Sequence, residues 1–213
     1  TRGVIVYLTQ KMHSSYKRDS LQMLHESIQR LFENYNAAQL DDLWFFHSGD
    51  VPVDDQRNVL SWCRPARAEF VQLDPWHFQV PPGAEQPRMP DHVQKSSKHI
   101  RHQWELQTRT WTLPLRFSAG YRHMIRFYTL GIWKLLADAG YQYMMRMDED
   151  SFIHSPIRYN LFDFMARRRL VYAYRLGNWE VDPHSSIHGK MHTFAREFIE
   201  QQNLTQRVES SGW

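Results

Sequence analysis

A regular alternation of short apolar runs and helical patterns constrains the fold most strongly. Residues 4–8 (Val-Ile-Val-Tyr-Leu), 43–46 and 69–73 are runs rich in β-branched and aromatic residues, typical of buried strands. Between the first two runs, apolar residues in 16–36 recur every three or four positions, which predicts an amphipathic helix. A shorter helix is expected at 54–62. Because strand, helix, strand order favours parallel strands joined by right-handed crossovers, we predict an α/β fold with a mostly parallel sheet flanked by helices.

The second half of the chain continues this alternation after an irregular stretch. Proline is concentrated in the first part of 74–114, which predicts a long irregular segment. Further elements are expected as a helix over 119–137 ended by Gly140, a strand near 143–147, a short helix at 159–167, a strand at 170–174 and a last helix at 186–202. No internal repeat is evident, so we expect one domain over residues 1–213.

Composition excludes several classes of protein. The chain has 213 residues, 42% of them hydrophobic, which is enough for one good-sized core. The net charge of +3 is small and the basic residues are dispersed, so no nucleic-acid partner is expected. Cys63 is the only cysteine, which excludes an internal disulfide. No apolar stretch approaches the length needed to cross a bilayer, so membrane attachment would require an anchor outside this sequence.

Three consecutive acids follow the expected strand near 143–147. In an extended segment, residues two apart point the same way, so Asp148 and Asp150 would face one cation while Glu149 points elsewhere. Carboxylate oxygens suit Mn²⁺ or Mg²⁺, which also bind phosphate oxygens and water. The alternative is an acidic, solvated turn after a core strand. Because ligands collect beyond the carboxyl ends of parallel strands, these acids mark the candidate site.

Other polar residues carry weaker signals. Arg146 interrupts an apolar strand, so we expect it to be buried and paired with a nearby carboxylate. His184 and His188 flank a predicted helix start and form a possible adventitious metal pair, although most of the 12 histidines are expected at the surface. No Gly-rich phosphate loop and no Gly-x-Ser-x-Gly turn is present, so phosphate binding would depend on a metal and side chains.

Two segments in register resemble a known family. Residues 117–128 contain Tyr-Arg-His-Met-Ile-Arg-Phe and are similar to the Tyr-Arg-His-Met-x-Arg-Phe signature of the fungal Golgi α-1,2-mannosyltransferases, glycosyltransferase family 15. Residues 143–150 resemble that family's Tyr-Tyr-Trp-Arg-Val-Glu-Pro-Asp segment at a comparable distance downstream. Residues 27–36, 159–165 and, more faintly, 192–202 are also similar, so the resemblance covers most of the chain.

The resemblance implies a Rossmann-like GT-A fold and a metal-dependent enzyme. It would transfer mannose from GDP-mannose, with retention and usually with Mn²⁺, to a glycan or glycoprotein acceptor in the Golgi lumen. Asp148 takes the place of the metal-binding Glu and Asp150 that of the second acid, while Tyr121 falls on the signature tyrosine. The expected catalytic residues are Tyr121 and Asp148, and the metal ligands are Asp148 and Asp150. The expected donor-binding residues are Tyr7, Tyr121, Arg122, Arg126, Asp148 and Asp150.

Two departures from the family keep alternatives open. The rigid proline of Glu-Pro-Asp is replaced by Glu149, and the first acid is one methylene shorter. The chain also ends at Trp213, before the region that holds the family's proposed catalytic carboxylate and a metal-binding histidine. A C-terminally truncated or divergent member is therefore expected. The alternatives are a non-catalytic glycan-binding or scaffolding module and a transferase that uses a UDP-sugar.

Overall fold

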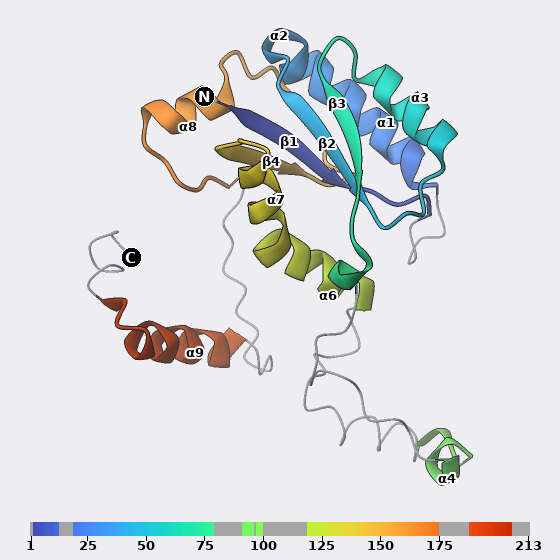
Figure 1. Ribbon diagram of the computed structural model, residues 1–213, viewed down its shortest axis with the longest axis vertical. Coiled ribbons are helices and arrows are strands. Elements are labelled where there is room, and N and C mark those ends of the chain that lie inside the picture. Colours follow the sequence, from blue (N-terminus) through green and yellow to red (C-terminus); the bar gives the residue numbers. More distant parts are fainter. Residues whose placement is uncertain are drawn as a thin grey trace. The chain divides into compact units, whose positions relative to one another are not determined.

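Four parallel strands form the sheet at the centre of the fold. They are β1 (Gly3–Leu8), β2 (Asp42–His47), β3 (Ala68–Gln72) and β4 (Tyr143–Met147), in the order β3-β2-β1-β4 (Figure 1). In the register, Tyr7 of β1 lies opposite Phe45 of β2 and Met147 of β4. The carboxyl ends of β1 and β4 are therefore level with each other, and the predicted parallel α/β fold is confirmed.

The computed structural model describes residues 2–12, 19–78, 91–95, 97–99, 119–174 and 188–205. The chain divides into two compact units, Thr1–Val171 and Tyr172–Trp213, and the sheet belongs to the first. The prediction of one domain over 1–213 stays a prediction. Most of the proline-rich segment at 74–114 lies outside the described residues. The described parts of this segment include two short helices, η2 (Pro75–Phe78) and α4 (Asp91–Gln94).

The strand order creates a switch point between β1 and β4. From β1 the chain builds outward through β2 to β3, and it then returns to add β4 on the other side of β1. In open parallel sheets, the connections that start on either side of such a point diverge and leave room for a ligand at the carboxyl ends of the strands. The acids that follow β4 stand at this point of the sheet.

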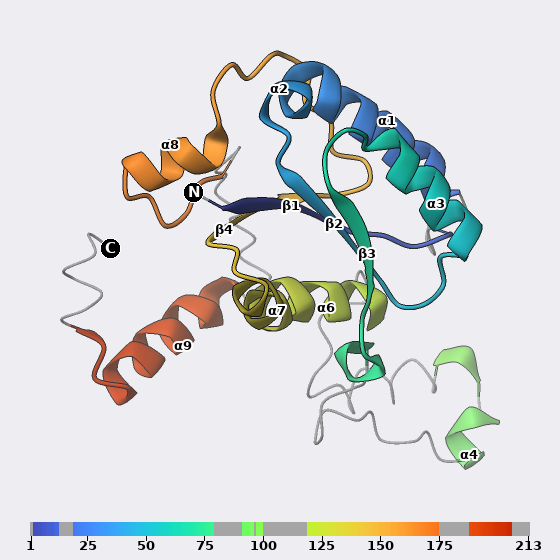
Figure 2. The same cartoon turned by 45° about the horizontal axis from the view of Figure 1, so that its top comes forward.

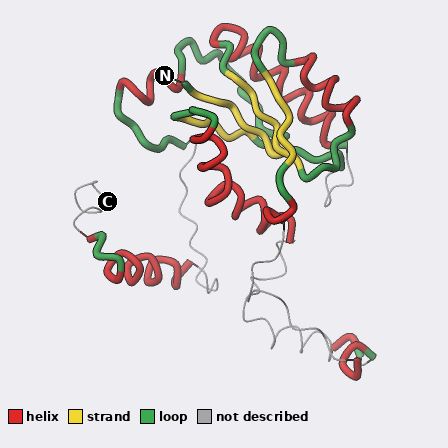
Figure 3. The backbone as a smooth tube through the Cα atoms, in the orientation of Figure 1, coloured by secondary structure: helices red, strands yellow, loops and turns green. Residues whose placement is uncertain are grey.

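Helices cover both faces of the sheet (Figures 1 and 2). The helices α1 (Ser20–Leu31) and α3 (Val53–Trp62) share a core with Ile5 and Tyr7 of β1. The crossover helix α6 (Ala119–Arg126), η3 (Phe127–Gly131) and α7 (Ile132–Asp138) packs on the other face, where Val4 and Val6 are buried. The tube in Figure 3 shows the strands between these two helical layers.

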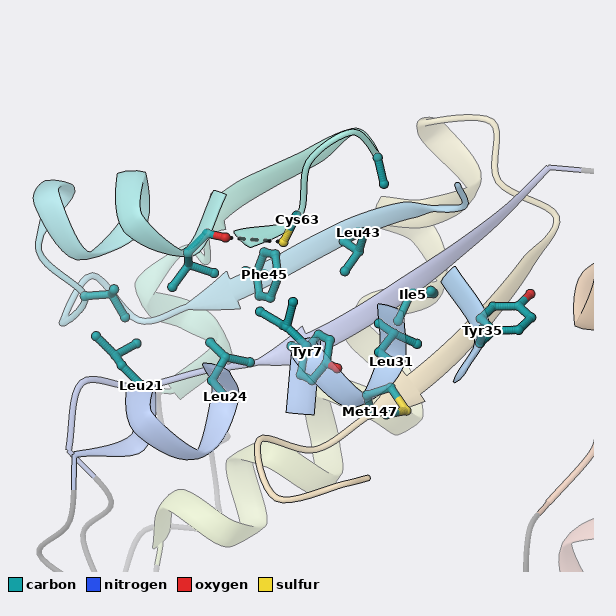
Figure 4. Close-up of a cluster of buried hydrophobic side chains, with 14 of the residues drawn as sticks. Ile5, Tyr7, Leu21, Leu24, Leu31, Tyr35, Leu43, Phe45, Cys63 and Met147 are labelled. Carbon is teal, nitrogen blue, oxygen red and sulfur yellow. Dashed lines mark hydrogen bonds between the residues drawn. The ribbon is translucent and has the colours of Figure 1, made fainter. Parts of the chain in front are cut away.

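The core beneath α1 and α3 is rich in aromatic rings (Figure 4). Tyr7 stacks on Phe45 with ring centroids 5.3 Å apart, and Phe45 stacks on Phe70 at 5.0 Å. Cys63 is fully buried in the same cluster, where its Sγ donates a weak hydrogen bond to the Val59 carbonyl. Burial raises the pKa of the Cys63 thiol to about 12, so it stays protonated and behaves as a small apolar side chain.

The helices begin and end close to the predicted residues, with two exceptions in their interior. The segments η1 (Phe32–Asn36) and η3 are single wide turns of π-helix, and a short α2 (Ala37–Gln39) follows the first. Such turns insert a residue into the helical repeat and are invisible to a pattern of three and four. After α7, Gly140 has a φ of +81°, which confirms its predicted role as the residue that ends the helix.

One predicted strand is absent. After the predicted short helix, observed as α8 (Leu161–Arg167), the described residues 170–174 are irregular, and Val171 and Tyr172 are 94% and 75% exposed. The strand prediction was wrong because its β-forming residues meet no sheet edge to pair with. The last predicted helix is confirmed as α9 (His188–Gln201), in the second unit. Within the described part of the chain, none of the helices has the length and apolar character required to span a bilayer.

Candidate functional site

The three acids leave the sheet in a tight turn. The Ser151 N–H donates to the Asp148 carbonyl at 2.9 Å, and the Asp148 N–H donates to the Ser151 hydroxyl oxygen at 3.2 Å. Strand geometry ends at Met147. The expectation of an extended acidic segment was therefore wrong, and two-residue alternation does not fix the direction of Asp150. A shared cation between Asp148 and Asp150 stays a prediction.

Asp148 forms a two-point ion pair with Arg146. The Arg146 Nε donates to Asp148 Oδ1 at 2.9 Å and its Nη2 donates to Oδ2 at 3.1 Å, which is the paired geometry preferred by a guanidinium and a carboxylate. The predicted carboxylate partner of Arg146 is confirmed. Its predicted burial is wrong, since 35% of the Arg146 side chain and 49% of that of Asp148 are exposed.

The ring of Tyr128 packs against the Arg146 side of this ion pair. The Arg146 Cζ lies 4.1 Å from the centre of the Tyr128 ring, a cation–π contact. Tyr128 is 7% exposed, and burial is the main cause that raises the pKa of its hydroxyl. The Leu8 backbone amide lies near this oxygen and lowers its pKa, but no hydrogen bond of ordinary geometry reaches it from the described residues. Among the described residues, the Tyr128 hydroxyl is thus a buried polar atom without a well-formed hydrogen bond.

Glu149 turns inward, unlike the acids beside it. It is 8% exposed, and its Oε1 accepts hydrogen bonds from the Thr9 hydroxyl at 2.6 Å and from the Gln10 N–H at 2.9 Å. The expectation that Glu149 points away from Asp148 and Asp150 agrees with its burial. Its contacts with the end of β1 were not foreseen. They follow from the pairing of β1 with β4, which brings residues far apart in the sequence together at one edge of the sheet.

A second hydrogen-bond path supports the turn from the core. The Ser27 hydroxyl of α1 donates to the Ser151 carbonyl at 2.6 Å, and it lies 3.0 Å from the Tyr7 hydroxyl oxygen. Tyr7 is fully buried, and burial raises the pKa of its hydroxyl. Its enclosed ring gives no support to the expectation that Tyr7 contacts a donor directly. The structure places Tyr7 beneath the acidic turn instead.

The signature segment forms helix α6, on the same face of the sheet as Arg146. Arg126 donates from Nη2 to the carbonyls of Trp76 and His77, at 2.7 and 2.9 Å, and so joins α6 to η2 after β3. Burial, followed by the charge of Arg126, lowers the pKa of His123. The side chains of Tyr121 and Arg122 lie outside the described residues, as do His184 and the side chain of His188. Roles for Tyr121, Arg122 and Arg126 in donor binding stay predictions.

The donor set at this turn suits a hard cation that brings other ligands with it. Asp150 is exposed and Asp148 is half exposed, so carboxylate oxygens face solvent at the switch point. In the described ranges, no three His, Cys, Asp or Glu side chains gather as a complete metal site. Mg²⁺ and Mn²⁺ commonly use one or two protein carboxylates together with phosphate oxygens and water. The residues present therefore fit a metal that is bound jointly with a diphosphate.

A helix-flanked parallel sheet with acids at its switch point defines the chain as an α/β protein of the GT-A glycosyltransferase type. The mannosyltransferase Ktr4p from S. cerevisiae is similar, with a TM-score of 0.55 and 21% identity over 78% of this chain and 37% of that one. Its structure in complex with GDP matches with a TM-score of 0.55 and 19% identity, over 79% of this chain and 38% of that one. The Mn/GDP form of core-mannan synthase A (CmsA/Ktr4) from Aspergillus fumigatus matches with a TM-score of 0.58 and 16% identity, over 79% and 40% of the two chains.

The chain belongs to glycosyltransferase family 15, because the model of that family, described as glycolipid 2-alpha-mannosyltransferase, matches residues 6–212. The resemblance found in the sequence is thereby confirmed. The chain spans less than half the length of the solved structures it matches. No curated protein sequence matches it significantly.

Proposed function

We propose that this chain forms the nucleotide-sugar-binding part of a mannosyltransferase that uses GDP-mannose and a divalent metal, Mn²⁺ or Mg²⁺. The observation that carries the proposal is the acidic turn at the switch point between β1 and β4, in a member of glycosyltransferase family 15. Solved structures with the same fold include a GDP complex and an Mn/GDP form, which supports a guanine nucleotide and manganese here. The acceptor is a glycan or glycoprotein, and the family relation favours the Golgi lumen.

In this proposal, different residues at the sheet edge bind the metal and the donor. Asp148 and Asp150 would hold the metal, which when bound offsets negative charge on the diphosphate leaving group. Arg146 lies within hydrogen-bond reach of Asp148 and supplies a second cation at the same edge. Tyr121, Arg122 and Arg126 of α6 would contact the donor from the side of the crossover helix.

Calorimetric titration of GDP and GDP-mannose, with and without Mn²⁺, tests the proposal. We expect binding that requires Mn²⁺ and that is lost in Asp148→Ala and Asp150→Ala. Asp138→Ala is the matched control, because Asp138 is an exposed acid at the end of α7 that forms an ion pair with Lys134. Binding that ignores the metal and survives Asp148→Ala would contradict the metal site. Tighter binding of UDP-glucose than of GDP-mannose would show that the donor is a UDP-sugar.

A non-catalytic glycan-binding module is the second candidate. The two-point ion pair with Arg146 favours it, since Asp148 already has a cationic partner. Binding of an oligomannose without release of GDP from GDP-mannose, in the presence of Mn²⁺, would support this candidate. Mn²⁺-dependent release of GDP would exclude it.

A further inference from the structure

We propose that Glu149 is a positioning residue, which fastens the acidic turn to the end of β1 and so keeps Asp148 and Asp150 on the exposed side of the turn. This inference rests on the proposed function, in which those two acids meet the metal and the diphosphate. Glu149 itself would touch neither, because it is 8% exposed and directed toward Thr9 and Gln10.

The burial of Glu149 is the first observation. Moving a carboxylate out of water is costly unless hydrogen bonds compensate for the lost hydration. The Thr9 hydroxyl and the Gln10 N–H both donate to the same oxygen, Oε1, and the 2.6 Å contact from Thr9 is in the short range of charge-assisted bonds. A surface turn that only had to be soluble would keep this side chain in water, as it does those of its neighbours.

The group to which Glu149 is fastened is itself fixed. Thr9 is 3% exposed, and its N–H donates to the Phe46 carbonyl of β2 at 2.8 Å. The path from Glu149 through Thr9 to Phe46 therefore runs across the carboxyl ends of β4, β1 and β2. A turn fastened to Thr9 keeps its place relative to the whole sheet edge.

Anchored and exposed residues alternate along the turn. The carboxylates of Asp148 and Asp150 are at least partly exposed to solvent, whereas Glu149 is held by β1 and Ser151 is held by Ser27 of α1. The Asp148 N–H also donates to the Ser151 hydroxyl. Each proposed metal ligand is therefore adjacent in sequence to a residue with a fixed position. Supporting contacts of this kind orient metal ligands, and their loss commonly costs metal affinity.

The experiment uses substitutions at Thr9, which stays clear of the metal and the donor. Thr9→Val keeps the shape but removes the hydroxyl that donates to Glu149, and Thr9→Ser keeps the hydroxyl as the matched control. At a temperature where all variants are folded, we expect Thr9→Val to weaken Mn²⁺-dependent GDP binding roughly 10- to 100-fold. Thr9→Ser should retain the wild-type affinity. Glu149→Gln keeps an acceptor oxygen of the same reach, so it should lose less affinity than Glu149→Ala.

A purely structural role for Glu149 would give a different result. Thr9→Val would then lower the melting temperature while the folded protein bound Mn²⁺ and GDP as tightly as the wild type, and that outcome would overturn the proposal. Amide hydrogen exchange of residues 148–151 provides a readout that needs no ligand. We expect faster exchange of the Ser151 amide in Thr9→Val than in the wild type and in Thr9→Ser.

Failure of the proposed function can be told apart from failure of this inference. If the wild-type chain binds no GDP with Mn²⁺, the proposed function fails, and the exchange measurement alone decides whether Glu149 positions the turn. Unchanged exchange of the Ser151 amide in Thr9→Val would overturn the positioning role in either case.

Discussion

Arg146 and Asp148 share the same face of the sheet at the end of β4, and two hydrogen bonds of 2.9 and 3.1 Å join their side chains. Because the pair uses both oxygens of Asp148, a cation that binds this carboxylate has to share these oxygens with the guanidinium or displace it. In the proposed metal site, Arg146 would therefore compete with the metal for Asp148, and the cation–π contact with Tyr128 holds the guanidinium in position.

Arg146→Met should strengthen the binding of Mn²⁺ in the absence of nucleotide. The Met side chain keeps the apolar contact with Tyr128 but removes the competing charge. An exposed ion pair contributes about 0.2–1 kcal/mol, so the affinity should rise by no more than about fivefold. Titration monitored by the electron paramagnetic resonance of free Mn²⁺ measures this affinity. Arg146→Lys keeps the charge without the two-point geometry, and a loss of metal affinity in Arg146→Met would contradict the competition.

Tyr128→Phe should stabilise the protein. The substitution removes a buried hydroxyl that lacks a well-formed hydrogen bond, so the free energy of unfolding should increase by about 1 kcal/mol. Urea unfolding measures the change, and a decrease in the free energy of unfolding would contradict the absence of a well-formed hydrogen bond.

Tyr35→Phe is the matched control for that substitution. The Tyr35 hydroxyl donates to Asp41 Oδ2 at 2.6 Å and accepts from the Leu161 N–H at 3.2 Å. Its removal should therefore lower the free energy of unfolding by about 2 kcal/mol. Equal effects of the two substitutions would show that the environment of the Tyr128 hydroxyl is not special.

Gly3→Ala should destabilise the first unit. A Cβ at Gly3 would overlap the ring of Phe162, which is 3% exposed and packs from α8 onto the core beneath α1. Overpacking of this kind costs roughly 1–3 kcal/mol, which urea unfolding would detect. Combining Gly3→Ala with Phe162→Leu should recover part of the loss, and a fully additive double variant would contradict direct contact.

Acidification from pH 7 to pH 5 should lower the free energy of unfolding, in part through His77. Burial is the main cause that lowers the pKa of His77 below its ordinary value of 6.5; the charge of Asp74 opposes this shift, and the smaller effect of Arg126 adds to it. The unfolded chain therefore binds a proton more readily than the folded protein as the pH falls through 6.5. The contribution of neutral His77 to the free energy of unfolding is therefore complete above pH 6.5 and is lost as the pH falls below it. Urea unfolding at both pH values should show a smaller difference in His77→Gln, and an unchanged difference would refute this assignment.

Strands and helices were predictable where one face of an element is buried. The apolar runs of β1 and β2 and the helical spacing of α1 report burial directly, and the structure confirms them. The prediction failed at 170–174, where β-forming residues lack a strand to pair with. Pairing depends on distant parts of the chain, which a local pattern does not contain.

The position of the acids in the fold was predictable, but the directions and partners of their side chains were not. The acids follow β4 as expected, and Arg146 meets a carboxylate as expected. The turn after Met147 breaks the alternation from which a common direction of Asp148 and Asp150 was derived. Partners such as Thr9, 140 residues away in sequence from Glu149, are brought together only by the pairing of β1 with β4.

The central place of β1 in the sheet has a consequence for how such a protein can move. Thr9 stands where three neighbouring strands finish, and through it the acidic turn is joined by hydrogen bonds to the sheet. If the protein moves when a ligand binds, we expect segments outside this sheet edge to shift while the acidic turn keeps its place.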